Sequence, residues 1–312
     1  MREAWFGLAI DAQSQENADL AIFGIPFDGA VFFRKGAAEG PGRIKDLSSK
    51  LPPVAEDGRV LDHMRIRDLP DVSPGGDRER FFAEVRERFG EARSRQIPLA
   101  LGGDHSVSIP LFEAADAWAG GDYGLIWIDA HPDLCDLYDG SPFSHACVLR
   151  RALEGPNLHP GNVVMLGVRS CEVDEIAFIE DMSLDLRSSA QLAASDAEQV
   201  GRELVERFRD LPVYLSIDID AFDPAYAPGT GIPDAGGLST RWVLDLLHAL
   251  YPLDLLAIDI VEVAPPLDTP SDATSLLALK LIVELLANLD RRADFPVQAA
   301  PPTPSRKPAT AG

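Results

Sequence analysis

Aspartates and histidines gather behind short apolar runs in this sequence. The run LIWI is followed by Asp-Ala-His-Pro-Asp, VYLSI by Asp-Ile-Asp, and QIPLAL by Gly-Gly-Asp-His. Six of these residues could bind a cation together: His105, Asp129, His131, Asp133, Asp218 and Asp220. Four carboxylates brought together repel one another by several kcal/mol at an effective dielectric constant of about 20, and cations relieve that repulsion. Oxygen and imidazole ligands without a thiolate suit Mn²⁺, with Zn²⁺, Co²⁺ or Fe²⁺ as substitutes.

The spacing of these residues supports a shared centre. Side chains alternate along a strand, so Asp129, His131 and Asp133 are expected to point the same way. Asp218 and Asp220 are expected to do the same from a second strand. An Asp-x-His or Asp-x-Asp pair by itself more often caps a helix or lies in a solvated loop. The prediction of a metal site therefore depends on the three clusters occurring together.

The elements that position these residues alternate along the chain. Strand-length apolar runs occupy residues 18–28, 96–105, 123–133, 162–170, 212–220 and 255–263. Helical spacing of apolar residues covers 77–94, 195–210, 239–250 and 271–292. This alternation predicts an α/β fold with three layers, α/β/α, around a mostly parallel sheet. In such sheets ligands bind beyond the carboxyl ends of the strands, where the polar residues lie.

One domain is expected in the 312 residues, because no linker interrupts residues 18–292. We predict an N-terminal extension over 1–17, a catalytic domain over 18–293, and a disordered Pro/Ala-rich tail over 294–312. The three cysteines argue against a disulfide framework. No secretory signal and no apolar stretch of about 20 residues are visible, so the cytoplasm is the expected location and no membrane is involved.

The net charge of the chain indicates which kinds of molecule it can bind. It has 50 acidic and 28 basic residues, for a formal net charge of −22. Phosphate backbones and anionic membrane surfaces would repel such a protein, which argues against nucleic-acid binding. A small cationic molecule is the partner that this charge favours.

Three motifs resemble the signatures of one enzyme family. They are Gly-Gly-Asp-His-Ser (102–106), Asp-Ala-His-Pro-Asp (129–133) and Ser-Ile-Asp-Ile-Asp-Ala-Phe-Asp-Pro (216–224). All three resemble motifs of the arginase/agmatinase ureohydrolases. The segments 24–44, 227–239 and 260–268 resemble other parts of that family, so the similarity covers about residues 18–290.

The resemblance implies two Mn²⁺ ions per subunit. His105 and Asp133 would bind one ion, His131 and Asp220 the other, and Asp129 and Asp218 would bridge both. Water activated between the ions would attack a guanidino carbon and release urea and an amine, with Asp133 accepting a hydrogen bond from that water. His145 would shuttle a proton to the leaving amine, and Glu262 would face the guanidinium. Members of the family are commonly trimers or hexamers.

The substrate implied is a small cationic guanidino compound, with agmatine favoured. The positions where arginases hold the amino-acid end of arginine are here Leu134-Cys135 and residues 141–144, which lack those polar groups. The shuttle segment is His145-Ala146-Cys147 where agmatinases commonly have His-Gly-Thr.

Two alternatives stay open. Hydrolases of guanidinobutyrate or guanidinopropionate share all the motifs, but need a cation for the substrate carboxylate. The candidates are Arg34, Lys35 and Arg169, although a structural ion pair is the expected role of Arg169.

The second alternative is a different class of protein, because the chain could be a catalytically silent binding subunit. Retention of all six predicted ligands favours the enzyme.

Overall fold

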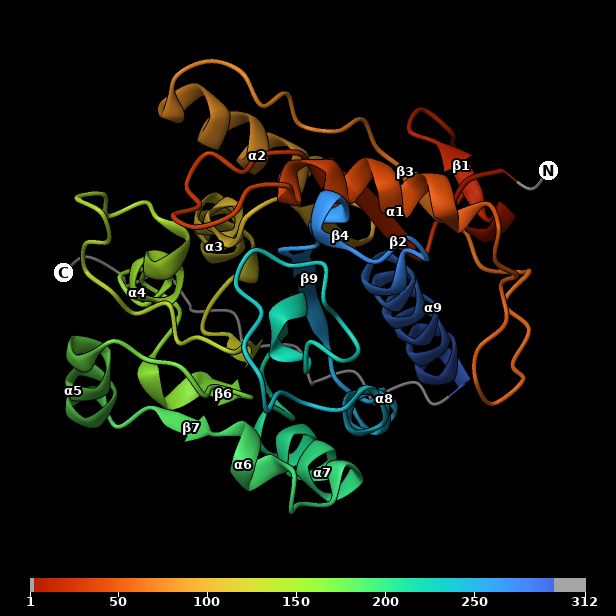
Figure 1. Cartoon of the computed structure of the whole chain (residues 1–312). Helices are drawn as coiled ribbons and strands as arrows, with labels where there is room; N and C mark the ends of the chain where they lie inside the picture. The colour runs from red at the N-terminus through yellow and green to blue at the C-terminus, as the bar shows by residue number, and fades with distance from the viewer. Residues whose placement is uncertain (1–2, 295–312) are drawn as a thin grey trace, which may run out of the picture.

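The computed structural model describes residues 3–294 and contains a nine-stranded sheet (Figure 1). The strands are β1 (Ala9–Asp11), β2 (Leu20–Ile25), β3 (Ile66–Asp68), β4 (Ile97–Gly102), β5 (Gly124–Ile128), β6 (Val163–Leu166), β7 (Asp185–Arg187), β8 (Val213–Asp218) and β9 (Leu255–Val261). Their order is β1-β3-β2-β4-β9-β8-β5-β6-β7, and every neighbouring pair is parallel. The predicted parallel α/β architecture is confirmed.

Helices cover both faces of the sheet (Figure 1). They are α1 (Gly40–Ser48), α2 (Arg78–Arg93), α3 (Ser108–Ala119), α4 (Val148–Ala152), α5 (Val173–Met182), α6 (Ser189–Leu192), α7 (Ala197–Arg207), α8 (Thr240–Ala249) and α9 (Ala273–Asp294). Helices α1 and α6 to α9 enclose one apolar core, while α2, α3 and α4 enclose the other. Alternation along β2 sends Leu20 and Ile22 to the first core and Ala21 and Phe23 to the second.

The predicted helices are present with local signals at their ends. Asp77 accepts a hydrogen bond from the amide of Arg80 at the start of α2, and Asp196 caps α7. All six predicted strands are present. The three short strands β1, β3 and β7 were not predicted, because three residues carry too little periodicity to be recognised.

The structure describes the N-terminal segment from residue 3 but ends at residue 294. The predicted extension packs onto the domain: Trp5 and Phe6 are buried, and β1 pairs with β3. The predicted tail lies outside the described residues from 295 onward. In the part of the chain that is described, no helix combines the length and apolar character needed to cross a bilayer.

The strand order explains where the polar residues meet. Strands β4, β9, β8 and β5 are consecutive in the sheet and parallel, so their carboxyl ends lie side by side. The predicted ligands follow β4 and β5 and end β8, and Glu262 follows β9. One rim of the sheet therefore receives all of them.

Candidate metal centre

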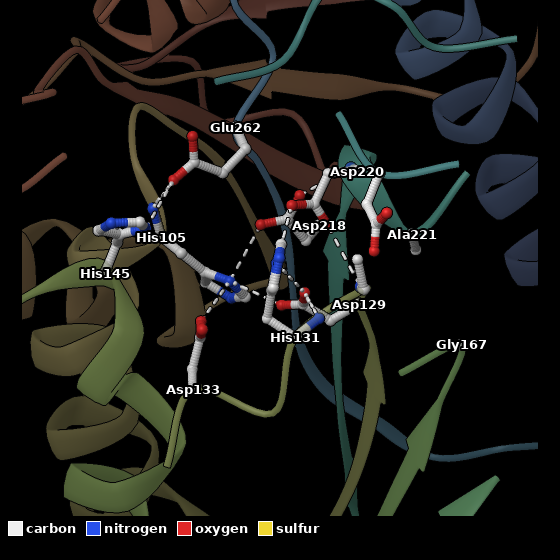
Figure 2. A network of polar contacts seen from close by, with 12 residues as sticks. His105, Asp129, His131, Asp133, His145, Gly167, Asp218, Asp220, Ala221 and Glu262 are labelled. Carbon is white, nitrogen blue, oxygen red and sulfur yellow. Dashed lines mark hydrogen bonds and ion pairs between the residues drawn. The ribbon is translucent and has the colours of Figure 1, made fainter. Parts of the chain in front are cut away.

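His105 lies at the middle of a buried carboxylate cluster (Figure 2). Its Nδ1 atom is 3.1 Å from Asp129 Oδ2, 3.3 Å from Asp133 Oδ2 and 3.2 Å from Asp218 Oδ2. All four side chains are at least nine-tenths buried. The structure thus brings together one imidazole and three carboxylates beside the ends of β4, β5 and β8.

His131 makes a second, adjoining group. Its Nδ1 atom is 3.1 Å from Asp220 Oδ2 and 3.6 Å from Asp129 Oδ1. Two sets of donor atoms, each within 4.8 Å of one another, could hold an ion: His105 with Asp129 and Asp218, and His131 with Asp129 and Asp220. Asp129 belongs to both sets, so the arrangement offers two adjoining candidate sites for cations.

The convergence has a different cause from the one predicted. Strand β5 ends at Ile128, so Asp129, His131 and Asp133 lie in a loop and not on a strand. Asp133 adopts a left-handed backbone conformation with φ of 51°. The expected strand alternation is therefore wrong for these residues, and the turns that follow β5 and β8 direct the side chains inward.

Backbone amides orient three of the carboxylates. Asp129 Oδ1 accepts from the amide of His131 (2.7 Å), and Asp218 Oδ1 accepts from the amide of Asp220 (2.7 Å). Asp220 Oδ1 accepts from the amide of Ala130 (3.2 Å). In each case the other oxygen, Oδ2, faces a histidine. Each carboxylate is thus held by one oxygen and offers the other to the centre.

A chain of hydrogen bonds fixes the tautomer of His105. Its Nε2 atom lies 3.1 Å from Ser216 Oγ, and that hydroxyl donates to Asp259 Oδ1 at 2.6 Å. Asp259 also accepts from Ser108 Oγ and Tyr214 OH, each at 2.8 Å. Because the single hydroxyl proton of Ser216 goes to Asp259, Ser216 accepts from Nε2–H of His105. In the neutral ring, which is the form that binds a metal, the Nδ1 lone pair then faces the carboxylates.

Two atoms at this point fit a cation. Within the described residues, His105 Nδ1 and Asp129 Oδ2 are buried without a hydrogen-bond partner. Unpaired buried polar atoms are costly, and a lone pair facing carboxylate oxygens is also repelled by them. A divalent ion bound by oxygen and imidazole ligands would satisfy both atoms.

The charges of the cluster also indicate that it could bind cations. Burial opposes protonation of His105, but the carboxylates around it outweigh burial and hold its pKa well above the usual value. Burial also lowers the pKa of His131, but the negative charge of Asp220 and its other carboxylate contacts outweigh burial and raise that pKa. Burial and the charge of Asp129 raise the pKa of Asp133 to about 7. Without metal, the cluster therefore retains protons where cations would otherwise bind.

His145 and Glu262 lie beside this cluster (Figure 2). His145 Nδ1 is 4.0 Å from Glu262 Oε1, and Nε2 accepts from the amide of Phe32 at 3.4 Å. Glu262 follows β9 with φ of 63°, and its Oε1 accepts from the amide of His105 at 2.9 Å. Burial, with the charges of His131 and His105, lowers the pKa of His145 to about 4, so the ring is neutral at neutral pH.

A cavity of about 230 Å³ opens next to the cluster. Its lining includes His131, Asp133 and His145 from the site, and Tyr138, Glu172 and Glu175 beyond it. Among the described residues that line it, none is a lysine or an arginine. Its electrostatic character is therefore acidic.

Some residues that support the candidate site were not predicted from the sequence. Ser216, Asp259 and Tyr214 were not singled out, although a serine and an aspartate inside the apolar runs VYLSI and LLAIDI are a signal of buried polar contacts. Arg169 was expected in an ion pair. The structure confirms this, because its Nε atom lies 3.7 Å from Asp234 Oδ2. Its hydrogen bonds go to backbone carbonyls.

Comparison with known proteins assigns the family. A sequence model of the arginase family matches residues 18–287. The chain belongs to the arginase family. Members of the arginase family are amidinohydrolases acting on guanidino C–N bonds and use a binuclear metal site, and this enzyme contains candidate ligands for such a site.

Its relatives in the arginase family differ in the substrates for which they are named. The chain is 34% identical over 278 residues to an agmatinase of Bacillus anthracis, covering 88% of this chain and 92% of that one. It is 33% identical over 283 residues to a guanidinopropionase of Pseudomonas aeruginosa, covering 86% of each. The structure of proclavaminate amidino hydrolase from Streptomyces clavuligerus superposes with a TM-score of 0.85 at 27% identity, covering 93% of this chain and 98% of that one.

Proposed function

We propose that this arginase-family enzyme is a dimanganese hydrolase that converts agmatine to urea and putrescine. The observation that supports it most is the pair of adjoining ligand sets that share Asp129. The donors are carboxylates and imidazoles without a thiolate, a set that suits Mn²⁺.

The six predicted ligands have distinct places in this proposal. His105 and Asp133 would hold one ion, His131 and Asp220 the other, and Asp129 and Asp218 would bridge them. When bound, two such ions lower the pKa of a water molecule towards neutrality and orient it for attack.

Glu262 is proposed to receive the guanidinium. Its carboxylate is buried beside the cluster, and one oxygen is held by the amide of His105. The other oxygen can accept from the planar guanidinium, whose N–H donors match a carboxylate well. Burial, with the charge of Asp104, raises the pKa of Glu262, so a cationic substrate would stabilise its ionised form.

His145 is proposed to move the proton that the reaction requires. A water oxygen bonds to the guanidino carbon, the bond from that carbon to the alkyl nitrogen breaks, and this nitrogen leaves as an amine after gaining a proton. Asp133 accepts a hydrogen bond from the attacking water, and neutral His145 takes up a proton and passes it to the leaving nitrogen.

The acidic cavity favours agmatine over guanidino acids. Agmatine carries an ammonium at its far end, whereas guanidinobutyrate and guanidinopropionate carry a carboxylate. Glu172 and Glu175 line the cavity, and the described lining contains no cation that would pair with a carboxylate. None of the three candidate cations, Arg34, Lys35 and Arg169, lines the cavity. Arg34 lies over the ring of Phe33, and Arg169 is bonded to backbone carbonyls.

The test is a substrate panel with the Mn²⁺-loaded enzyme. Agmatine, arginine, guanidinobutyrate and guanidinopropionate are compared by urea release. We expect the highest kcat/KM for agmatine. A higher value for a guanidino acid would overturn the substrate assignment but keep the chemistry. Absence of urea from every compound would favour the silent binding subunit.

We also propose that the enzyme acts in the cytoplasm as a homotrimer or homohexamer. Cys135, Cys147 and Cys171 are free thiols, which suits a reducing compartment. Light scattering coupled to gel filtration measures the mass, and a monomer would contradict the oligomeric part of this proposal.

A further inference from the structure

Arg169 follows strand β6 and points its guanidinium at the backbone beside the metal ligands. Its side chain is 8% exposed. Nη2 donates to the carbonyls of Asp220 and Asp234, each at 2.7 Å, and Nη1 donates to the carbonyls of Ala221 at 3.2 Å and Gly167 at 3.3 Å. Nε donates to the carbonyl of Asp234 at 3.2 Å. All five N–H groups of the guanidinium therefore have backbone acceptors, and none is available to a substrate.

The main chain of Arg169 holds the other ligand loop. The amides of Arg169 and Ser170 both donate to the carbonyl of Ala130, at 2.9 and 3.2 Å. Ala130 lies between Asp129 and His131, and its own amide donates to Asp220 Oδ1 at 3.2 Å. One residue thus fastens the loop after β5 through its backbone and the turn after β8 through its side chain.

We propose that Arg169 is the positioning residue for the half of the metal centre formed by His131 and Asp220. The inference rests on the proposed binuclear site and adds a residue that touches neither substrate nor ion. Its guanidinium holds the carbonyl of Asp220, so removing it frees the turn that carries one ligand of this half. His105 has separate support, because Ser216 holds its ring and Glu262 accepts from its main-chain amide.

The selectivity of the effect distinguishes positioning from general stability. Outer contacts of metal ligands change metal affinity by about 10- to 100-fold. We expect Arg169→Met to weaken one of two Mn²⁺ ions by that factor and to leave the other bound. Arg169→Lys, which keeps the charge but offers three donors from a single nitrogen, should weaken the same ion less.

Arg67 supplies a matched control. Its guanidinium is also buried and donates to backbone carbonyls, those of Asp11, Ala12, Ser14 and Glu16, near β1 and β3. Arg67→Met should lower the melting temperature and leave both Mn²⁺ affinities unchanged.

Equilibrium dialysis with metal analysis, combined with Mn²⁺ electron paramagnetic resonance, gives the decisive readouts. Arg169→Met should lose the spin-coupled signal of an ion pair and show the spectrum of isolated Mn²⁺ at one ion per chain. Excess Mn²⁺ should restore kcat without changing KM for agmatine. If Arg169→Met does not fold, the same measurements on Arg169→Lys show whether one ion is weakened selectively.

Three results would overturn the inference: unchanged affinity for both ions, equal weakening of both, or the same selective loss in Arg67→Met. The proposed function is judged separately. If the wild-type enzyme binds two ions but releases no urea, the proposed reaction is wrong. The role of Arg169 in metal binding is then still tested by the dialysis.

Discussion

Asp129 connects the two halves of the candidate metal centre at the scale of single residues. Its Oδ2 faces His105, and its Oδ1 lies 3.6 Å from His131 Nδ1. The two proposed ions would be linked through this carboxylate and through Asp218. A change at either of these two bridging carboxylates should therefore affect both ions.

Substitution of a ligand tests the assignment of these residues. We expect His131→Ala or Asp218→Asn to remove at least one Mn²⁺ per chain and to abolish turnover. Metal content by mass spectrometry and urea release measure the two effects. His159→Ala is the control, because this histidine pairs with Asp122 and is 54% exposed. Retention of both ions in either ligand variant would show that the assigned ligand is wrong.

Glu262→Gln separates guanidinium recognition from metal binding. The amide oxygen of glutamine can still accept from the amide of His105, but the negative charge that faces the substrate is lost. A hydrogen bond to a charged group contributes about 1.5 to 3 kcal/mol, so KM for agmatine should rise about 10- to 100-fold with metal content unchanged. Steady-state kinetics beside the exposed control Glu203→Gln measure this. Unchanged kinetics would remove Glu262 from the binding site.

His145 should make the folded protein sensitive to acid. Burial, with the charges of His131 and His105, lowers its pKa to about 4 from the ordinary 6.5. Between these values the unfolded chain binds a proton that the folded chain does not, so acidification favours unfolding. The contribution is complete above pH 6.5 and is lost as the pH falls through 4.

The variant His145→Gln isolates this contribution. Melting temperatures of both proteins are measured from pH 7.5 to 4, and the variant should lose less stability over that interval. Parallel curves would show that His145 titrates at its ordinary pKa.

The loops that follow the strands hold the site together. At Gly103, the loop after β4 packs against the loop after β2. Gly103 follows β4, its amide donates to the carbonyl of Ile25, and a Cβ added to it would overlap the carbonyl of Phe27. The segment after Phe27 carries the amide of Phe32, which donates to His145. The conformation of this segment and the placement of His145 are thus coupled through a position that only glycine can occupy.

Gly103→Ala should therefore disturb both folding and catalysis. Overpacking costs about 1 to 3 kcal/mol, and displacement of the segment after Phe27 should lower kcat. Gly42→Ala is the control: its added Cβ meets nothing within 4 Å, and alanine favours a helix by about 1 kcal/mol. Urea denaturation and activity assays compare the two. A Gly103→Ala protein as stable and active as wild type would contradict the close packing.

The elements also show how far sequence analysis can reach. The six apolar runs predicted six strands, and helical spacing over 77–94 and 195–210 predicted α2 and α7, because periodicity is a local signal. The turns that orient Asp129 and Asp220 were not predicted. Their shape depends on amides such as that of Ala130, which is 90 residues from Asp220 in sequence. The spacing therefore predicted which residues are candidate ligands, whereas the tertiary contacts determine how they converge.

The whole molecule carries a net charge of −22, and four of its carboxylates lie together at the rim of the sheet. Bound cations would offset the repulsion among the four carboxylates gathered there. Ligand binding to the folded state stabilises a protein by about 2.7 kcal/mol when the free ligand is at 100 times its Kd. Removal of the metal should thus be visible as a change in global stability.

Chelation tests this coupling. We expect EDTA to lower the melting temperature by several degrees and Mn²⁺ to restore it, because the carboxylates then face one another without cations. His131→Ala should show a smaller shift than wild type. An identical melting temperature in all conditions would mean that the cluster holds no metal in the folded protein.

Anomalous diffraction from Mn²⁺-loaded crystals at the manganese edge would locate the ions of the proposed binuclear centre. We expect two peaks per chain, one contacted by His105 and Asp133 and one by His131 and Asp220, with Asp129 and Asp218 between them. A single peak, or none within reach of these side chains at saturating Mn²⁺, would contradict it.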